Sequence, residues 1–366
     1  MLRIAFTTIA ACAALALAAP APGQAQSRVV NVYNWSDYVD PEMLAAFTAE
    51  TGIRVVYDTY DTNEIVETKL YAGRSGYDIV VPSGPFVERL VQAGIFAPLD
   101  TSRLPNLEHI WPAVAERTAV YDPGNVHSVN YMWGTTGIGI NVEMVRARLG
   151  DAPLDTWSLL FDPEIAAKLA DCGIHVLDAV DDMFPTALNY LGLDPNSRDA
   201  DDLAKAAELL AGVTPHVRRF HSSEYINALA NGDICLAVGY SGDVLQARDR
   251  AAEAGSGVEI AYLIPQEGAL MWFDSFAIPA DAPNIEEAHA FIDFMLRPEV
   301  AAANTNYVAY ASGNLAAKEF VDPEILADPG VYPSDETMAR LFTNTAYDER
   351  TQRVVTRHWT RIKTGR

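Results

Sequence analysis

The sequence predicts an α/β fold of two lobes joined by paired extended segments. Its 366 residues are too many for one ordinary hydrophobic core and suit two domains of typical size. Near the N-terminus, short β-branched runs alternate with helix-like stretches, which is the rhythm of a parallel sheet with right-handed crossovers. Two extended apolar runs, 129–141 and 271–278, then allow the chain to cross between the lobes and to return.

The first lobe is expected to begin with three strand–helix pairs. Strands are predicted over residues 29–33, 53–57 and 77–81, and helices over 41–51, 63–72 and 86–93. Each helix stops at a glycine, which is the residue best suited to the turn after a helix. Ligands of such sheets bind at the carboxyl ends of the strands, so loops 34–38 and 82–85 are candidate binding loops.

A second α/β unit follows the first crossing. We expect strands at 174–177 and 234–238, helices around 182–191 and 201–211, an extended run from 258 to 264 and a helix at 286–296. Further helical pieces are expected from residue 315 onward. These features divide the mature chain into a first lobe of residues 27–135 plus about 260–312 and a second lobe of about 136–259 plus 313–366.

Residues 1–26 have the pattern of a secretory signal peptide. Arg3 supplies the positive start, an Ala/Leu-rich apolar run follows, and small residues around Gly23 and Ala25 suit cleavage. The run is short for a bilayer span, which needs about 20 residues. An alternative is a lipoprotein box ending at Cys12, although few apolar residues precede that cysteine. We therefore expect export to the periplasm.

The charge balance is strongly acidic. The chain carries 26 Lys+Arg against 49 Asp+Glu, a net charge of −23, which disfavours nucleic acid and anionic lipid as partners. It permits a cationic ligand without requiring one, since many proteins are acidic for solubility. With 49% hydrophobic and 20% charged residues, the composition is that of a folded globular protein.

Two cysteines, Cys172 and Cys235, remain after removal of the signal. In an oxidising compartment, an even pair favours a disulfide, and closing so long a loop could stabilise the fold by about 4 kcal/mol. The alternative is a pair of buried free thiols, because the sequence does not give their separation.

Catalytic signatures are weak. The chain has no HExxH and no CxxC motif, so we expect no metal and no cofactor. The stretch 239–242 lacks the last glycine of a nucleophile elbow, and 134–139 lacks the Lys-Ser/Thr of a phosphate-binding loop. A carboxylate pair for glycoside hydrolysis stays open, since acids are abundant.

Aromatic and carboxylate residues occur side by side after several predicted strands. The clusters are 35–38 (WSDY), 239–243 (GYSGD) and 271–274 (MWFD), with Asp178, Asp181 and Asp182 after another strand. Tyr310 lies in a tract expected to be extended, 306–312 (NYVAYAS). Ring faces bury methylenes and attract ammonium groups, and carboxylates fix each ammonium by charge-assisted hydrogen bonds. A linear polyamine fits this mixture. Taken singly, each ring could belong to the core, and Asp181, Asp182 or Asp243 could cap a helix.

The sequence resembles the periplasmic polyamine-binding proteins of ABC transporters, most closely the putrescine type. The similar stretches are YNWSDYVDP (33–41), FTAETGIRVVYDTYDTNE (47–64), GYDIVVPS (76–83), MWGTTGIGIN (132–141), FHSSEYINALANGDICLAVGYSGDV (220–244) and WFDSFAIP (272–279). The resemblance implies the type II periplasmic-binding-protein fold, with mixed, mainly parallel sheets in two lobes and a two-segment hinge. It also implies a non-enzymatic, monomeric protein that delivers its ligand to an inner-membrane ABC permease.

The family's binding residues can be carried over position by position. They fall on Trp35, Ser36, Asp37, Tyr38, Ser83, Asp182, Tyr240, Asp243, Trp272, Asp274 and Tyr310, and the family's disulfide falls on Cys172–Cys235. The chain departs from the family pattern at Asp182, where Glu is usual and Asp181 is adjacent, and at Tyr240, which replaces Trp. Because of these departures and Pro85, the ligand could be spermidine, agmatine or cadaverine instead of putrescine. The functional alternatives are a ligand-sensing receptor and a secreted carboxylate-pair hydrolase.

Overall fold

The computed structural model describes residues 28–364. The expected signal peptide and the alternative lipid site at Cys12 lie outside these residues. None of the helices within 28–364 is both long and apolar enough to cross a membrane.

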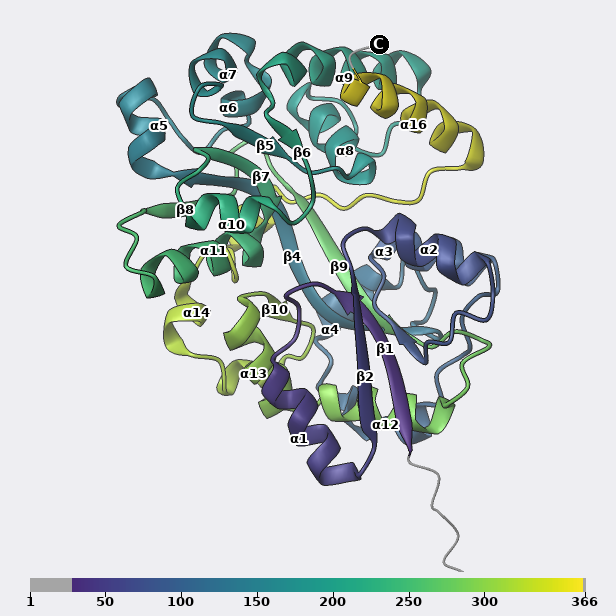
Figure 1. The fold of residues 1–366 in the computed structure, drawn as a ribbon. Helices are drawn as coiled ribbons and strands as arrows, with labels where there is room; N and C mark the ends of the chain where they lie inside the picture. Colours follow the sequence, from purple (N-terminus) through teal and green to yellow (C-terminus); the bar gives the residue numbers. More distant parts are fainter. Residues whose placement is uncertain (1–27, 365–366) are drawn as a thin grey trace, which may run out of the picture.

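The described part of the chain folds around one mixed sheet with helices on its faces (Figure 1). The strand order is β2-β1-β3-β9-β4-β7-β5-β6, and β8 and β10 also pair with β4. The strands run as follows: β1 (Val29–Trp35), β2 (Arg54–Tyr60), β3 (Ile79–Val80), β4 (Ser128–Asn141), β5 (Ile174–Val176), β6 (Arg219–Phe220), β7 (Leu236–Tyr240), β8 (Ile260–Leu263), β9 (Leu270–Ala277) and β10 (Ala311–Ser312).

Each outer part of the sheet is parallel, and its centre is antiparallel. β1 pairs in parallel with β2 and β3, and β5 pairs in parallel with β6 and β7. Between these two groups, β4 and β9 run antiparallel to each other and to their neighbours. The predicted α/β class with mixed sheets is therefore confirmed.

β4 and β9 are the two crossings expected from the extended apolar runs. β4 pairs with β9 along its first part and with β7 and β8 along its last part, so one continuous strand belongs to both halves of the sheet. Every residue of β4 and β9 is buried, which explains why both read as apolar runs without alternation.

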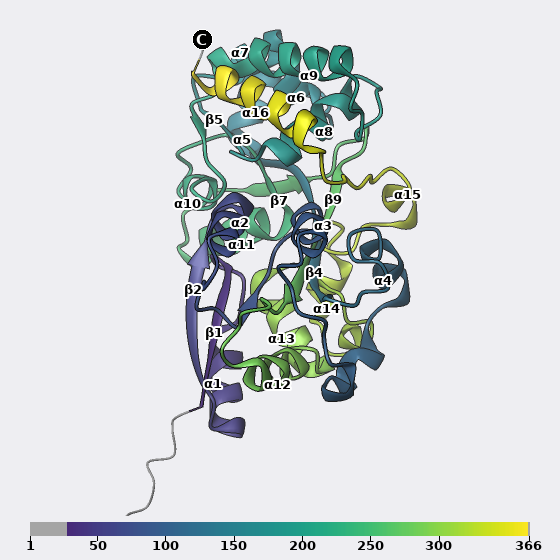
Figure 2. The same cartoon turned by 90° about the vertical axis from the view of Figure 1, so that its right-hand side faces the viewer.

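Helices surround the sheet in two groups that are visible as two masses in Figure 2. The first group packs near β1–β3: α1 (Pro41–Thr51), α2 (Asn63–Tyr71), α3 (Gly84–Gln92), α4 (Pro112–Thr118), α12 (Ile285–Met295) and α13 (Pro298–Val308). The second packs near β5–β7: α5 (Val142–Leu149), α6 (Ser158–Phe161), α7 (Pro163–Leu169), α8 (Val180–Tyr190), α9 (Ala200–Val213), α10 (Tyr225–Ala230), α11 (Ser241–Glu253) and α16 (Glu349–Thr364). The remaining short helices are α14 (Pro323–Ala327) and α15 (Asp335–Met338), with 3₁₀ turns at Thr101–Arg103, Pro105–His109, Thr214–His216 and Ala316–Glu319.

Local sequence explains how these helices begin and end. In α1, the Asp40 side chain accepts a hydrogen bond from the backbone N–H of Glu42, Pro41 occupies the first turn, and Gly52 follows with a φ of 70°. That left-handed conformation is one that glycine adopts without a steric penalty. The predicted helix therefore starts and stops where the sequence indicates.

Two hydrophobic cores lie in the two masses. One includes Phe47 and Phe291 beneath β1 and β3, and the other includes Trp157 and Trp359 around β5 and β7. We call the two masses the first and second lobe. Ala317, assigned to the second lobe from the sequence, packs against Ala301 of α13 in a separate small cluster. The residue ranges of the lobes stay a prediction.

The predicted disulfide is present. Cys172 and Cys235 are bonded, with their Cα atoms 5.5 Å apart. The two cysteines lie just before β5 and β7, which pair in parallel, so the bond joins the starts of two neighbouring strands of the second lobe.

The sequence-based assignment was wrong in two places. The strand expected at 77–81 shortens to β3, and just before it the Asp78 carboxylate accepts hydrogen bonds from the backbone N–H groups of Asn31 and Asn284. The tract 306–312 is not extended throughout: α13 runs to Val308, Ala309 has a φ of 57°, and only two residues form β10. The alternative in which Asp182 and Asp243 cap helices is excluded, because α8 begins at Val180 and α11 at Ser241 and both acids lie inside first helical turns.

Candidate functional site

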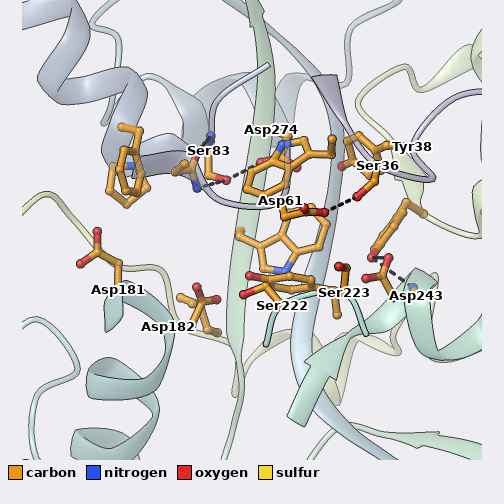
Figure 3. A pocket seen from close by; sticks show the side chains of 18 of the residues that line it. Ser36, Tyr38, Asp61, Ser83, Asp181, Asp182, Ser222, Ser223, Asp243 and Asp274 are labelled. Atoms are coloured by element: carbon orange, nitrogen blue, oxygen red, sulfur yellow. Dashed lines mark hydrogen bonds between the residues drawn. The ribbon is translucent and has the colours of Figure 1, made fainter. Parts of the chain in front are cut away.

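A cavity of about 730 Å³, part of it open to solvent, lies between the two lobes. Its wall is made by loop residues after β1 and β2, the start of α3, the starts of α8 and α11, and the β9 crossing (Figure 3). The lining residues are Trp35, Ser36, Tyr38, Asp61, Asn63, Ser83, Pro85, Phe86, Asp181, Asp182, Ser222, Ser223, Ile226, Tyr240, Asp243, Leu270, Trp272, Asp274, Tyr310 and Asn344.

The cavity brings together all the residues carried over from the family pattern except Asp37. These residues come from segments more than 270 positions apart in the chain, from Trp35 to Tyr310. They meet because the strand ends and helix starts of both lobes face the gap that β4 and β9 bridge.

Asp37 does not line the cavity. Its carboxylate Oδ1 forms an ion pair with Nη2 of Arg250 at 2.8 Å, and its side chain is 45% exposed. Arg250 lies on α11 of the second lobe, whereas Asp37 follows β1 of the first. The WSDY motif therefore places Trp35, Ser36 and Tyr38 on the wall and directs Asp37 to an ion pair between the lobes.

Aromatic rings form the middle of the cavity. The ring of Trp272 lies edge-on to Tyr240, with centroids 5.7 Å apart, and to Tyr310, with centroids 5.2 Å apart. Tyr310 in turn contacts Tyr38 at 5.2 Å. Trp35 is held by a hydrogen bond from its Nε1 to the carbonyl of Val81 (2.9 Å). Each ring is fixed by a neighbour, so the apolar surface is preformed.

Asp243 lies at one end of the cavity and is held by two phenols. The hydroxyl of Tyr310 donates to Oδ1 at 2.6 Å, and that of Tyr225 donates to Oδ2 at 2.7 Å. Burial raises the pKa of Asp243 to about 6, against the two phenol hydrogen bonds, which lower it.

Asp274 projects from β9 toward the same cavity. Oδ1 accepts a hydrogen bond of 2.6 Å from the hydroxyl of Ser83, which Asn63 in turn contacts at 3.0 Å. Burial raises the pKa of Asp274 to about 7, and the nearby Asp243 adds to the shift.

Asp182 belongs to the first turn of α8, on the second lobe. Its Oδ1 accepts a hydrogen bond from the hydroxyl of Thr136 at 2.9 Å. Burial raises the pKa of Asp182 to about 7, with smaller contributions from the negative charges of Asp181, Glu64 and Asp274. Asp274 is buried and Asp182 and Asp243 are half-buried, so all three acids are costly to ionise unless a cation joins them.

Several lining residues escaped the sequence analysis. Asp61 and Asn63 follow directly after β2, so the strand-end rule that found Trp35 would have found them. Ser222 and Ser223 follow β6 in the same way. Phe86 and Asn344 had no such signal: Phe86 lies inside α3, and Asn344 lies in the connection before α16.

Within residues 28–364, no group of three or more His, Cys, Asp or Glu side chains is arranged to hold a metal ion. The cavity instead combines aromatic walls with carboxylates at separate points, as Figure 3 shows for Asp182, Asp243 and Asp274. Such an arrangement can bind an elongated cation whose middle is apolar.

The chain is similar to known proteins along most of its length. Residues 42–333 match the family described as bacterial extracellular solute-binding protein. The chain is 49% identical to the putrescine-binding periplasmic protein PotF of Escherichia coli over 344 residues, covering 93% of each chain. It is also 49% identical to the putrescine-binding periplasmic protein SpuD of Pseudomonas aeruginosa over 357 residues, covering 96% of this chain and 97% of the relative.

A solved structure has the same fold. The spermidine/putrescine ABC transporter substrate-binding protein PotD of Streptococcus pneumoniae superimposes with a TM-score of 0.76 at 32% identity, covering 92% of this chain and 99% of that one.

Proposed function

The chain belongs to the family of bacterial extracellular solute-binding proteins, and on that premise we propose that it binds a linear polyamine, with putrescine favoured. It would carry the amine in the periplasm to the permease of an ABC importer. The family membership supports both the ligand class and the compartment, and so do the names of two relatives that are 49% identical to this chain in sequence. The chain would act by binding, without turnover of the ligand.

One observation carries the proposal: the cavity between the lobes combines buried carboxylates with a preformed aromatic middle. We assign Asp243 and Asp274 to one ammonium group of the ligand and Asp182 to the other. Trp272, Tyr240 and Trp35 would then pack against the methylenes. Ser36, Tyr38, Ser83 and Tyr310 would complete the wall by contact or by hydrogen bonds to the acids.

The energetics favour a dication over a neutral ligand. Removing a carboxylate from water is costly, and the raised pKa values of Asp182, Asp243 and Asp274 express that cost. An ammonium group placed against each end restores a favourable charge balance and keeps its hydrogen bonds. A sugar or an anion would leave the acids uncompensated.

Calorimetric titration of ligand-stripped protein with putrescine, cadaverine, agmatine and spermidine tests the proposal. We expect one amine per chain, with Asp243→Asn and Asp274→Asn each weakening putrescine binding by about 2–5 kcal/mol, because each leaves an ammonium without its partner. Asp171→Asn is the matched control, since Asp171 pairs with Arg148 on the surface of the second lobe. Full affinity in both cavity variants, or no heat with any amine, would reject the proposal. Release of product from a glycoside or ester would favour the hydrolase instead.

A further inference from the structure

Arg89 lies behind the acidic end of the cavity without lining it. It belongs to α3 of the first lobe, and its Nε and Nη2 donate to the two carboxylate oxygens of Glu67 at 2.9 and 3.4 Å. The guanidinium also stacks on the ring of Phe86, with its central carbon 4.0 Å from the ring centroid. These contacts fix the guanidinium through Nε, Nη2 and its flat face, and Nη1 takes no part in them.

Nη1 of Arg89 faces Asp181 of the second lobe. The distance from Nη1 to Oδ2 is 3.7 Å, which is an ion pair but too long for a good hydrogen bond. Within the described residues, neither carboxylate oxygen of Asp181 nor Nη1 of Arg89 has a hydrogen-bond partner. Asp181 is only 8% exposed and lines the cavity. A buried acid thus keeps unused hydrogen-bonding capacity toward the ligand space and has one cation behind it.

Asp181 lies beyond Asp182, at the end of the cavity away from Asp243 (Figure 3). A diamine held between Asp243 and Asp182 would stop short of Asp181. Glu64 lines the same end, so this region carries more negative charge than a second ammonium group needs. The charge left over must be neutralised by the protein, by protons or by a third ammonium group.

We propose that Arg89 neutralises Asp181 when the lobes close and thereby makes the cavity prefer a diammonium ligand to a triammonium one. This inference rests on the proposed polyamine function. With Arg89 in place, a longer amine that reaches Asp181 must compete with a guanidinium that Glu67 and Phe86 hold in position. It also brings its third positive charge close to that guanidinium. Both effects penalise the triamine and leave the diamine untouched.

The test compares putrescine and spermidine affinities by calorimetry in four proteins. Arg89→Gln frees Asp181, so we expect the ratio of spermidine to putrescine affinity to rise about tenfold. Arg89→Lys is the matched control: it keeps the charge and should shift the ratio much less. In Arg89→Gln with Asp181→Asn, neither charge remains, and the ratio should return toward that of the unmodified protein.

The outcomes separate the inference from the proposed function. If the unmodified protein binds neither amine, the proposed function fails. If it binds putrescine but Arg89→Gln leaves the ratio unchanged, or the double variant keeps the full shift, only the role of Arg89 is wrong. Thermal melting of each variant establishes that it is folded. If Arg89→Gln does not fold, Asp181→Asn tests the inference by itself. If Arg89 already pairs with Asp181, this variant should lower spermidine affinity by no larger a factor than putrescine affinity.

Discussion

Three carboxyl groups, one buried and two half-buried, decide how this cavity behaves. Asp182, Asp243 and Asp274 are each held by hydroxyl donors, from Thr136, from Tyr225 and Tyr310, and from Ser83. Despite these donors, burial raises all three pKa values, to about 7, 6 and 7. Ligand-free, the site therefore holds protons at neutral pH that a cation would have to displace.

Affinity for a diamine should fall as the solution is acidified. The ligand's ammonium groups stay charged, since their ordinary pKa is near 10, whereas the three acids take up protons as the pH drops through 7 and 6. We expect putrescine affinity to decrease about tenfold or more between pH 8 and pH 5. Calorimetry in buffers of different ionisation enthalpy should detect proton release on binding near pH 6.5. Affinity independent of pH, with no proton release, would contradict this.

The raised pKa values of these acids also determine how the stability of the folded protein depends on pH. In the unfolded chain these acids titrate near 3.9, so between that value and about 7 the folded, ligand-free protein binds more protons. Its stability should therefore fall as the pH rises through that window. Asp274→Asn should reduce the fall while it weakens binding.

The sequence indicated which side chains line the cavity where they follow predicted strand ends, and it misplaced one where a tertiary contact redirects it. Trp35, Ser83 and Asp274 reach the cavity because the ends of β1, β3 and the middle of β9 meet there. Asp37 follows the same strand as Trp35, yet Arg250, more than 200 positions away, draws it to an ion pair. No local sequence pattern predicts an ion-pair partner so distant in the chain.

At the scale of elements, the start of α11 determines the shape of the cavity. Gly242 lies in its first turn, against the ring of Tyr310, and a Cβ on Gly242 would lie 2.6 Å from two ring carbons. Asp243 follows immediately and accepts the hydrogen bond of the Tyr310 hydroxyl. The close approach of helix and ring therefore holds one of the acids in place.

Gly242→Ala should displace the Tyr310 ring and weaken the hydrogen bond to Asp243. We expect overpacking to cost about 1–3 kcal/mol in stability and to lower putrescine affinity as well. Gly212→Ala in α9 is the control, because a Cβ there meets nothing within 4 Å. That control should stabilise the protein by up to about 1 kcal/mol through helix propensity, with unchanged affinity. Melting curves and titrations measure both; equal behaviour of the two variants would show that the approach to Tyr310 is unimportant.

Elements whose residues face one environment throughout were predictable from sequence. β4 and β9 are buried along their whole length, so their composition alone indicated extended crossings. The tract 306–312 was not, because it leaves α13 through the left-handed Ala309 before forming β10. Residues 308–312 are buried both at the helix end and in the short strand, so burial alone does not distinguish the two.

In the whole molecule, the disulfide lies within one lobe, and only the backbone joins the two lobes covalently. The Cys172–Cys235 bond joins two strands of the second lobe, so it stabilises that lobe without tying it to the first. Between the lobes, the backbone runs through β4, β9 and the connection before α16. Side-chain contacts between the lobes include the Tyr310–Asp243 hydrogen bond and the Asp37–Arg250 ion pair. The ion pair is partly exposed, so it adds little by itself.

Closure of the lobes should therefore depend on the ligand. Without a cation, the fraction of these acids that is ionised repels across the cavity, against side-chain contacts such as the Tyr310–Asp243 hydrogen bond and the Asp37–Arg250 ion pair. A diamine removes the repulsion and adds contacts to both lobes, so it stabilises the closed form by its differential affinity. Small-angle scattering should show a smaller radius of gyration at saturating putrescine. The variant carrying Asp243→Asn and Asp274→Asn should show no such change at the same concentration, because it binds poorly. If calorimetry proves saturation of the unmodified protein while its scattering stays the same, the lobes do not move on binding, and selectivity must come from a cavity that is already closed.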